Sequence, residues 1–176
     1  MGEGILEVIK TRRSIRRYKN IKVDLEKINL ILEAGRWAPS SGNLQNWYFI
    51  VVQDKKKINK IAEYCMQPWI STAPLVIVVC SDTERVVDWY GERGRFYSIQ
   101  NIAAAIQNML LQAHSIGLGS CWIGAFNEEK IKELLKIPKN IEVHAIITLG
   151  YPDESPESER KPLEDIVFFE EWGSKP

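Results

Sequence analysis

Hydrophobic side chains recur at helical spacing in five stretches of this chain, and the pattern predicts five helices. A short polar residue precedes three of these stretches, where a side chain can accept the free backbone N–H groups of a first turn. The predicted helices cover residues 5–9 and 97–116 and begin after Asp24, Asp54 and Asn127. The 97–116 stretch is apolar around much of its circumference, which predicts a central helix buried on several sides.

Apolar runs between these helices predict the strands. Residues 47–52 and 75–80 form continuous β-prone runs, which indicates two buried strands. A short run at 120–123 and an alternating pattern of apolar and mixed residues at 141–149 predict two more strands. Strands and helices alternate along the chain, so the pattern favours the α/β or the α+β class.

The composition is typical of a folded protein without net charge. The chain has 176 residues, 45% of them hydrophobic, which predicts a single domain over residues 1–176. Lys and Arg number 23, as do Asp and Glu, and this balance argues against a nucleic-acid partner. The apolar runs are too short to span a bilayer, and the first residues show no apolar signal core. We therefore expect no membrane partner and a cytoplasmic location.

Cysteines and histidines point to neither a metal site nor a disulfide framework. The three cysteines are an odd number and form no CxxC pair. The two histidines, His114 and His144, are too few for a His-based metal site. No nucleophile motif of a catalytic triad is present, so we expect no catalytic side chain of that kind.

A cluster of cations near the N-terminus is the most informative candidate site. Residues 11–18 read Thr-Arg-Arg-Ser-Ile-Arg-Arg-Tyr, which places four arginines around one serine. The guanidinium fork matches phosphate oxygens in a bidentate way, so a bound phosphate would offset the repulsion among them. Arg160 and Lys161 could complete the same site. The alternative is solvated surface charge or a targeting signal.

Two further segments combine small and polar residues. Residues 38–47 carry two hydroxyls, a glycine and three side-chain amides before a predicted strand, which suits the edge of a planar heterocycle. An ordinary turn that ends a helix would have the same composition. Residues 117–126 alternate small and bulky side chains and would allow a ligand to approach the backbone. They follow a predicted helix, so they do not form a dinucleotide fingerprint.

In order and position these segments resemble the FMN-dependent nitroreductase family, and the resemblance runs from Ile5 to about Val167. The matching segments are 12–16, 39–47, 90–94, 101–118, 117–126 and 160–163. The chain departs from the family pattern at Asn46, where a proline is usual, and at Asn101, where an aspartate is frequent.

The resemblance implies an α+β fold with a central, mostly antiparallel sheet flanked by helices. It also implies an intertwined homodimer with two FMN molecules at the interface. The C-terminal segment, about residues 163–176, would embrace the partner subunit, which would explain the apolar side chains near the end of the chain. NAD(P)H would deliver hydride to flavin N5, and a nitroaromatic or quinone acceptor would then enter the same site in a ping-pong cycle.

The resemblance further assigns roles to single residues around FMN. Arg12 and Ser14, with Arg160 and Lys161, would hold the phosphate. Arg13 would lie along the ribityl chain. No side chain needs to act as a general acid or base, because the flavin carries the chemistry.

The flavin ring is expected to meet residues from several other segments. Arg16 would lie near the N1–C2=O end, where a fixed cation stabilises the charge of the reduced ring. Asn43 and Gln45 would contact the pyrimidine edge, and Pro39, Ser40 and Ser41 of the partner subunit would contact the ring. The backbone of Gly124 and Ala125 would lie near N5. Trp89, Tyr90 and Phe96 would border the open face of the ring and shape the choice of acceptor.

Other functions remain open at this point. The same fold could perform reductive dehalogenation, flavin fragmentation or ring oxidation. The protein could instead be a non-enzymatic flavin carrier, or a basic binding module without flavin. A flavin spectrum and acceptor-dependent NAD(P)H oxidation distinguish these alternatives.

Overall fold

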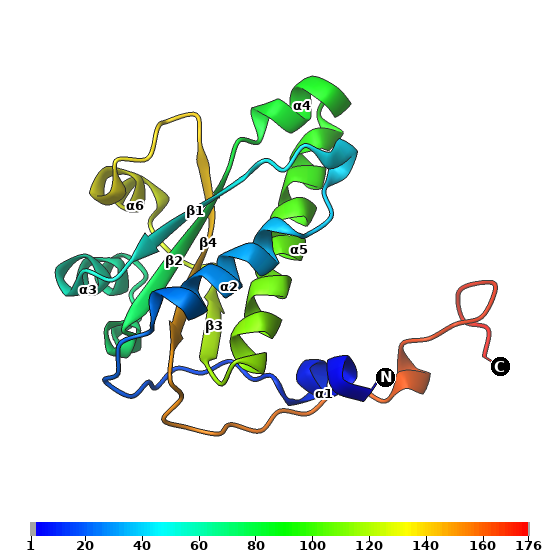
Figure 1. Ribbon diagram of the computed structural model, residues 1–176. Coiled ribbons are helices and arrows are strands. Elements are labelled where there is room, and N and C mark those ends of the chain that lie inside the picture. The colour runs from blue at the N-terminus through cyan, green and yellow to red at the C-terminus, as the bar shows by residue number, and fades with distance from the viewer. Residues whose placement is uncertain (1–2, 176) are drawn as a thin grey trace.

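The computed structural model describes residues 3–175 and has an α+β fold built on a four-stranded antiparallel sheet. The strands lie in the order β1 (Trp47–Val52), β2 (Leu75–Ser81), β4 (Glu142–Gly150) and β3 (Gly119–Ile123), and each pairs antiparallel with its neighbour (Figure 1). The α+β class and the antiparallel sheet are as predicted. Residues 1, 2 and 176 of the predicted domain lie outside the described range.

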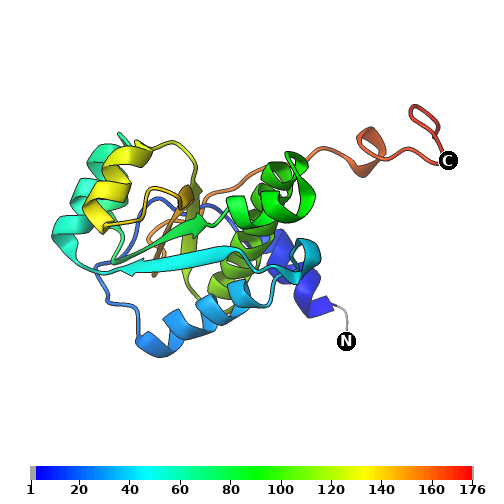
Figure 2. The same ribbon diagram turned by 90° about the horizontal axis from the view of Figure 1, so that it is seen from above.

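Two helices cover one face of the sheet. They are α2 (Leu25–Arg36) and the long α5 (Arg93–Ser115), which pack against each other over the central strands (Figures 1 and 2). The packing is close, because a Cβ added at Gly35 of α2 would lie 2.9 Å from the side chain of Met109 on α5. As the sequence predicts, α5 is central, and it begins four residues before the predicted start.

The opposite face is covered by α3 (Lys55–Tyr64) and α6 (Glu128–Leu135), with a short 3-10 helix beside them. The predicted caps of both helices are confirmed. The Asp54 carboxylate accepts a hydrogen bond from Lys57 N at 2.8 Å, and the Asn127 side chain accepts one from Lys130 N at 3.0 Å. Each cap satisfies a backbone donor that the first helical turn leaves free.

The expectation of a buried strand is wrong for β1. This strand lies at one edge of the sheet, where Tyr48 is 49% exposed and Val51 is 37% exposed. By contrast, β2 is buried along its whole length, because it has a neighbour on each side and helices on both faces. Between β2 and α5 the chain forms the short helix α4 (Glu84–Tyr90).

The two ends of the chain lie outside the main layers (Figures 1 and 2). Helix α1 (Glu3–Thr11) exposes Ile5 and Leu6, and the C-terminal arm extends away from the body of the molecule. Apolar residues of the arm are exposed, Leu163 by 72% and Trp172 by 90%. Within residues 3–175, no helix is both long and apolar enough to cross a membrane.

Candidate cofactor site

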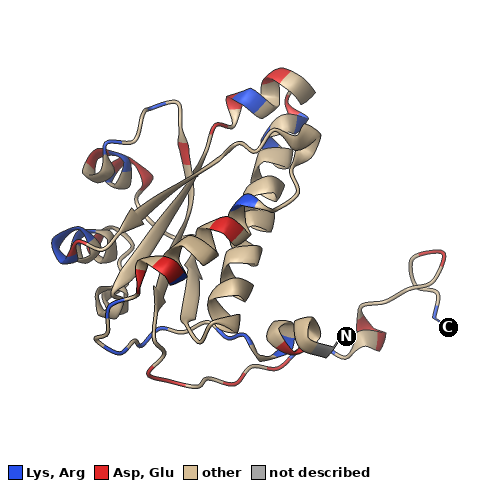
Figure 3. Cartoon of the chain, viewed as in Figure 1, with Lys and Arg blue, Asp and Glu red and all other residues tan. Residues whose placement is uncertain are grey.

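The arginine segment lies along the outer edge of β3. Ile15 N donates to Ser120 O at 2.9 Å, and Ser14 forms a parallel bridge with Ser120. A Cβ at Gly119 would lie 2.7 Å from the Ile15 side chain, so only glycine allows this approach. The same segment runs beside the acidic stretch after β4, and Figure 3 shows their opposite charges.

The Arg12 side chain is half-buried at the start of the cluster. Burial lowers its pKa, and the neighbouring guanidinium groups of Arg160 and Arg13 lower it further. The charge of Arg160, 148 positions further along the chain, therefore acts on Arg12, which is consistent with the phosphate hypothesis. Such a group of cations is stabilised when an anion binds among them.

A cavity of about 210 Å³ opens at this cluster. Its lining includes Arg12, Arg13, His114 and Ser120. The Ser120 side chain is 1% exposed, and its hydroxyl has no hydrogen-bond partner among residues 3–175. A buried hydroxyl without a partner is costly, which indicates that a ligand or an ordered water completes the cavity. We call this space the basic cavity.

His114, which the sequence indicates only as structural, borders the basic cavity. The Thr11 hydroxyl donates to Glu7 O at 2.7 Å, so the 2.8 Å contact between Thr11 Oγ1 and His114 Nε2 is one in which the histidine donates. Burial lowers the pKa of His114, and the charges of Arg12 and Arg13 lower it further. An anion in the cavity would oppose this effect.

Other members of the predicted phosphate and ribityl group point in different directions. Arg13 turns back to α1, where its Nη1 donates to Lys10 O at 2.5 Å and to Arg12 O at 2.8 Å. Lys161 is exposed on the arm. Ser14 lies beside the thiol of Cys121, whose pKa is raised by burial.

Arg16 lies further along the segment, next to η2 (Pro68–Thr72). Its backbone N–H donates to Glu154 Oε1 at 2.5 Å, and its guanidinium lies 6.0 Å from the centre of the Trp69 ring. Arg16 is exposed, whereas Arg12 is half-buried. Trp69, which was not predicted from the sequence, is therefore a neighbour of the site.

Residues 39–45 form a second candidate region, which we call the serine loop. Its backbone is tightly turned, with positive φ angles at Gly42, Asn43 and Gln45. Gln45 N donates to Ser40 Oγ at 3.1 Å, and Gln45 Nε2 donates to Asn43 O at 3.1 Å. The Gln45 amide thus satisfies the loop's own backbone, as the ordinary-turn alternative proposes.

The serine loop borders a cavity of about 550 Å³. Pro39, Ser40 and Ser41 line it from the loop side, together with Tyr90 of α4. Residues of α5 complete the lining; they are Tyr97, Gln100, Asn101 and Ala104. The sequence did not predict Tyr97, Gln100 or Ala104 as site residues, although their polar and small character on an apolar helix is the signal that could have identified them.

Asn101 fixes the serine loop to α5. Its Oδ1 accepts from Ser41 N at 2.9 Å, and its Nδ2 donates to Ser41 Oγ at 3.0 Å. The same Nδ2 donates to Asn46 Oδ1 at 2.9 Å. The two positions at which the chain departs from the expected family pattern, Asn46 and Asn101, are therefore hydrogen-bonded to each other.

Within one chain the two cavities lie at different ends of α5. Asn101 borders the serine-loop cavity and His114 borders the basic cavity. Thirteen residues of helix separate them, which is about 20 Å. The charge of Arg160 thus acts on Arg12, whereas the serine loop lies toward the other end of α5.

The remaining predicted residues are exposed. Gly124 and Ala125 follow β3 at its exposed end. Trp89 is 67% exposed and Phe96 is 53% exposed, with the Arg93 guanidinium 5.7 Å from the Phe96 ring centre. Of the three predicted aromatic residues, Tyr90 alone lines the serine-loop cavity. The structure describes no metal-binding group of His, Cys, Asp and Glu residues within 3–175.

An antiparallel sheet covered by helices on both faces, with a basic cavity at one edge, defines an α+β protein whose cavity is suited to a small anionic ligand. Comparison with known proteins identifies the family within this class. Residues 9–72 and 66–151 match the model of the Nitroreductase family. The chain belongs to the nitroreductase family, and the protein is an oxidoreductase.

Similar proteins cover nearly the whole chain. An FMN-dependent nitroreductase from Clostridium difficile R20291 is 35% identical, with a TM-score of 0.83, over 95% of this chain and 99% of that one. The FMN reductase [NAD(P)H] of Bacillus subtilis is 34% identical over 94% of this chain and 74% of its own. NADPH:FMN oxidoreductase from Vibrio harveyi, solved with NAD+, has a TM-score of 0.86 and is 28% identical. The match covers 98% of this chain and 79% of that one.

Proposed function

We propose that the protein is an FMN-dependent oxidoreductase that takes hydride from NAD(P)H and passes electrons to a small acceptor, such as a nitroaromatic or a quinone. FMN and NAD(P)H are the cofactors of this family-level function. The observation that carries the proposal is the basic cavity at the edge of β3. Arg12 lines this cavity beside the unpartnered Ser120 hydroxyl, and the charge of Arg160 acts on Arg12.

The residues of the basic cavity fit the phosphate end of FMN. A phosphate carries nearly two negative charges and three acceptor oxygens, which guanidinium groups and a hydroxyl donor satisfy. Arg12, Ser14, Arg160 and Lys161 would hold this group. Arg13 would reach the ribityl chain only after it leaves the carbonyl groups of Lys10 and Arg12.

The ring of FMN would extend from the phosphate along the edge of β3. Arg16 would face its N1–C2=O end, and the backbone of Gly124 and Ala125 would lie near N5. When it is bound, FMN supplies the redox chemistry, accepting a hydride and releasing electrons to a second substrate in the same site. The protein binds and orients both substrates in turn, so ping-pong kinetics are expected.

We further propose that the active protein is a homodimer whose interface contains both cavities. The serine loop lies about 20 Å from the basic cavity in its own chain, so a second copy would have to supply Pro39, Ser40, Ser41, Asn43 and Gln45 to the ring. The exposed apolar arm, about residues 163–176, is suited to cover that copy. Trp89, Tyr90 and Phe96 would then border the open side of the ring.

The proposal is tested on the purified protein. We expect a flavin absorbance spectrum and heat-released FMN, identified by chromatography, at about one FMN per chain. NAD(P)H oxidation should depend on an added nitroaromatic or quinone. FAD as the sole cofactor, or no flavin at all, would refute the proposal. FMN without acceptor-dependent turnover would instead support a flavin carrier.

A further inference from the structure

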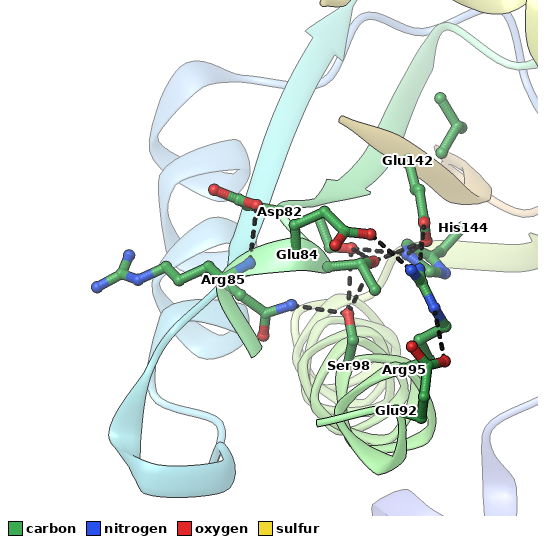
Figure 4. Close-up of polar contacts among 12 residues, drawn as sticks. Asp82, Glu84, Arg85, Glu92, Arg95, Ser98, Glu142 and His144 are labelled. Carbon is green, nitrogen blue, oxygen red and sulfur yellow. Dashed lines mark hydrogen bonds and ion pairs between the residues drawn. The ribbon is translucent and has the colours of Figure 1, made fainter. Parts of the chain in front are cut away.

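A chain of buried hydrogen bonds runs from the serine loop through the molecule to the surface. It starts with the bonds of Asn101 to Ser41 and Asn46 described above. Asn46 Nδ2 then donates to Ser98 Oγ at 2.8 Å. Figure 4 shows the far end, where Ser98 of α5 points toward Glu142 and His144 of β4.

The direction of this chain is determined by its first member. The backbone N–H of Ser41 can only donate, so the atom of Asn101 that it contacts must be the oxygen Oδ1. The amide nitrogen of Asn101 therefore donates to Ser41 Oγ and to Asn46 Oδ1. It follows that Asn46 donates to Ser98 through its own nitrogen.

The far end imposes the same direction. Thr83 Oγ1 donates to the Glu142 carboxylate at 2.7 Å, because an ionised carboxylate only accepts. Thr83 is then an acceptor for Ser98, whose Oγ lies 3.1 Å away. Arg95 Nη1 lies 3.8 Å from Glu142 Oε1 and forms an ion pair with it. Donors and acceptors thus follow one another from Ser41 N to Glu142 without a conflict.

This direction determines what the Ser41 hydroxyl presents to the cavity. Its oxygen accepts from Asn101, and among residues 3–175 the hydroxyl hydrogen has no acceptor. Ser40 is arranged alike, because its oxygen accepts from Gln45 N. Both serines line the 550 Å³ cavity, so their hydroxyl hydrogens are free to donate to a molecule there.

We propose that Asn101 is a positioning residue that makes Ser41 a hydrogen-bond donor toward the ring of FMN. The inference rests on the proposed function, since the ring would meet the serine loop of a second copy. The carbonyl oxygens and the nitrogens N1 and N5 of oxidised flavin are acceptors, so a serine held as a donor complements them. Asn101 acts through Ser41 and does not itself need to touch the cofactor.

An aspartate at position 101 would reverse this arrangement with little change in shape. A carboxylate still accepts from Ser41 N, but it also accepts from the Ser41 hydroxyl, whose oxygen lone pairs then face the cavity. Asn46 would have to turn its nitrogen toward residue 101, and Ser98 would then donate to the Asn46 oxygen. Asn101→Asp therefore changes Ser41 from donor to acceptor.

The test measures FMN binding to cofactor-free protein and the midpoint potential of the bound flavin. We expect Asn101→Asp to weaken FMN binding about ten-fold, the effect of one hydrogen bond, and to shift the potential in the negative direction. Ser41→Ala should also weaken binding. In the Ser41→Ala background, Asn101→Asp should change the dissociation constant by less than about three-fold, because the two residues act as one unit.

Asn108→Asp is the matched control. Asn108 lies on the same helix, and its Nδ2 donates to Ala34 O at 3.1 Å, so this variant loses a hydrogen bond of similar kind. It should lower the melting temperature without changing the potential of bound FMN. If both aspartate variants affect FMN equally, or if the double variant is additive, Asn101 is merely structural.

Other outcomes separate this inference from the function on which it rests. A wild-type protein that binds no FMN refutes both. A wild-type protein that binds FMN and reduces acceptors, with FMN affinity and potential unchanged in Asn101→Asp, refutes the role of Asn101 alone. If Asn101→Asp does not fold, Ser41→Ala still tests the proposal. Normal FMN affinity in Ser41→Ala would overturn it.

Discussion

Arg12 illustrates how one residue can be unfavourable for folding and necessary for binding. Its pKa is lowered by burial and by the charges of Arg160 and Arg13, so the folded protein disfavours this cation unless an anion is present. We predict that Arg12→Ala weakens FMN binding by about 1.5–3 kcal/mol, the usual contribution of a charged hydrogen bond. The melting temperature of the cofactor-free protein should stay the same or rise. Flavin titration and thermal melts measure the two effects.

Arg36→Ala is the control for the loss of one positive charge. Arg36 is exposed at the end of α2, pairs with Glu33 and does not line the basic cavity. This variant should bind FMN as the wild type does. Equal loss of affinity in both variants would mean that Arg12 acts only through net charge.

His144 predicts a pH dependence of stability. Burial lowers its pKa below the usual value of about 6.5, although Glu142 and Glu128 act in the opposite direction. The unfolded chain then binds more protons than the folded one, so the stability contribution is complete above about pH 6.5 and is lost as the pH falls through the folded pKa. We predict a lower melting temperature at pH 5.5 than at 7.5, and a smaller difference in His144→Gln.

His114 has a lowered pKa as well, so His144→Gln should remove only part of the pH effect. Melts of His114→Gln and of the double variant separate the two contributions. A pH dependence that is the same in all four proteins would contradict this assignment.

At the scale of single residues, the sequence indicates the role of a side chain when its chemistry favours one kind of ligand. The proximity of Arg12 and Arg160 follows from the need of cations for a shared anion. Arg13 could not be placed in the same way, because the free carbonyl groups at the end of α1 compete for its guanidinium. Gln100 could not be predicted as a site residue from burial alone, because it lies on a polar face of the otherwise apolar helix α5.

At the scale of elements, the packing of α4 on α5 carries Tyr90 to the serine-loop cavity. A Cβ at Gly94 would lie 2.5 Å from Val86 O, so the two helices meet backbone to backbone. Tyr90 then packs edge-on against Tyr97, with ring centres 5.2 Å apart. The short α4 is therefore held in a defined position, although its outer face is exposed.

We predict that Tyr90→Ala changes the ratio of kcat/KM between nitroaromatic and quinone acceptors, with normal FMN content, because it removes one wall of the cavity. Trp89→Ala and Phe96→Ala should change the ratio too if these residues border the open side of the ring in the dimer. Tyr48→Ala, which removes an exposed tyrosine from β1, is the control. An unchanged ratio in all three test variants would make these aromatics structural.

Helices and their caps were predictable from the sequence where contacts between neighbouring residues determine them. The caps at Asp54 and Asn127 are local, since each side chain bonds to a backbone group three residues later. The exposure of β1 was not predictable, because an apolar run has the same composition at the edge of a sheet and at its centre. Which strands are neighbours depends on contacts between distant parts of the chain.

At the scale of the whole molecule, the C-terminal arm (described here over residues 163–175) extends away from the layers that form the core (Figure 1). Most of its apolar residues are exposed; they are Leu163, Ile166, Phe169 and Trp172. We predict that ending the chain after Leu163 yields protein that is monomeric and poor in FMN, because the dimer loses the cover that the arm provides. Sedimentation and flavin absorbance measure both properties.

Met66→Ala is the control for the removal of exposed apolar surface. Met66 is 88% exposed at the end of α3, away from the arm. This variant should remain dimeric and retain its flavin. A truncated protein that stays dimeric with full flavin would show that the arm is dispensable for assembly.

The close contact of Ile15 with Gly119 has a consequence for solubility. An edge strand with free backbone groups is a template on which strands of other molecules can add and grow into aggregates. At β3 this edge is covered, because Ile15 N–H bonds to Ser120 O and arginine side chains lie alongside. The segment expected to hold FMN thus also protects the sheet from adding foreign strands. A substitution that loosened it would cause precipitation as well as loss of the cofactor.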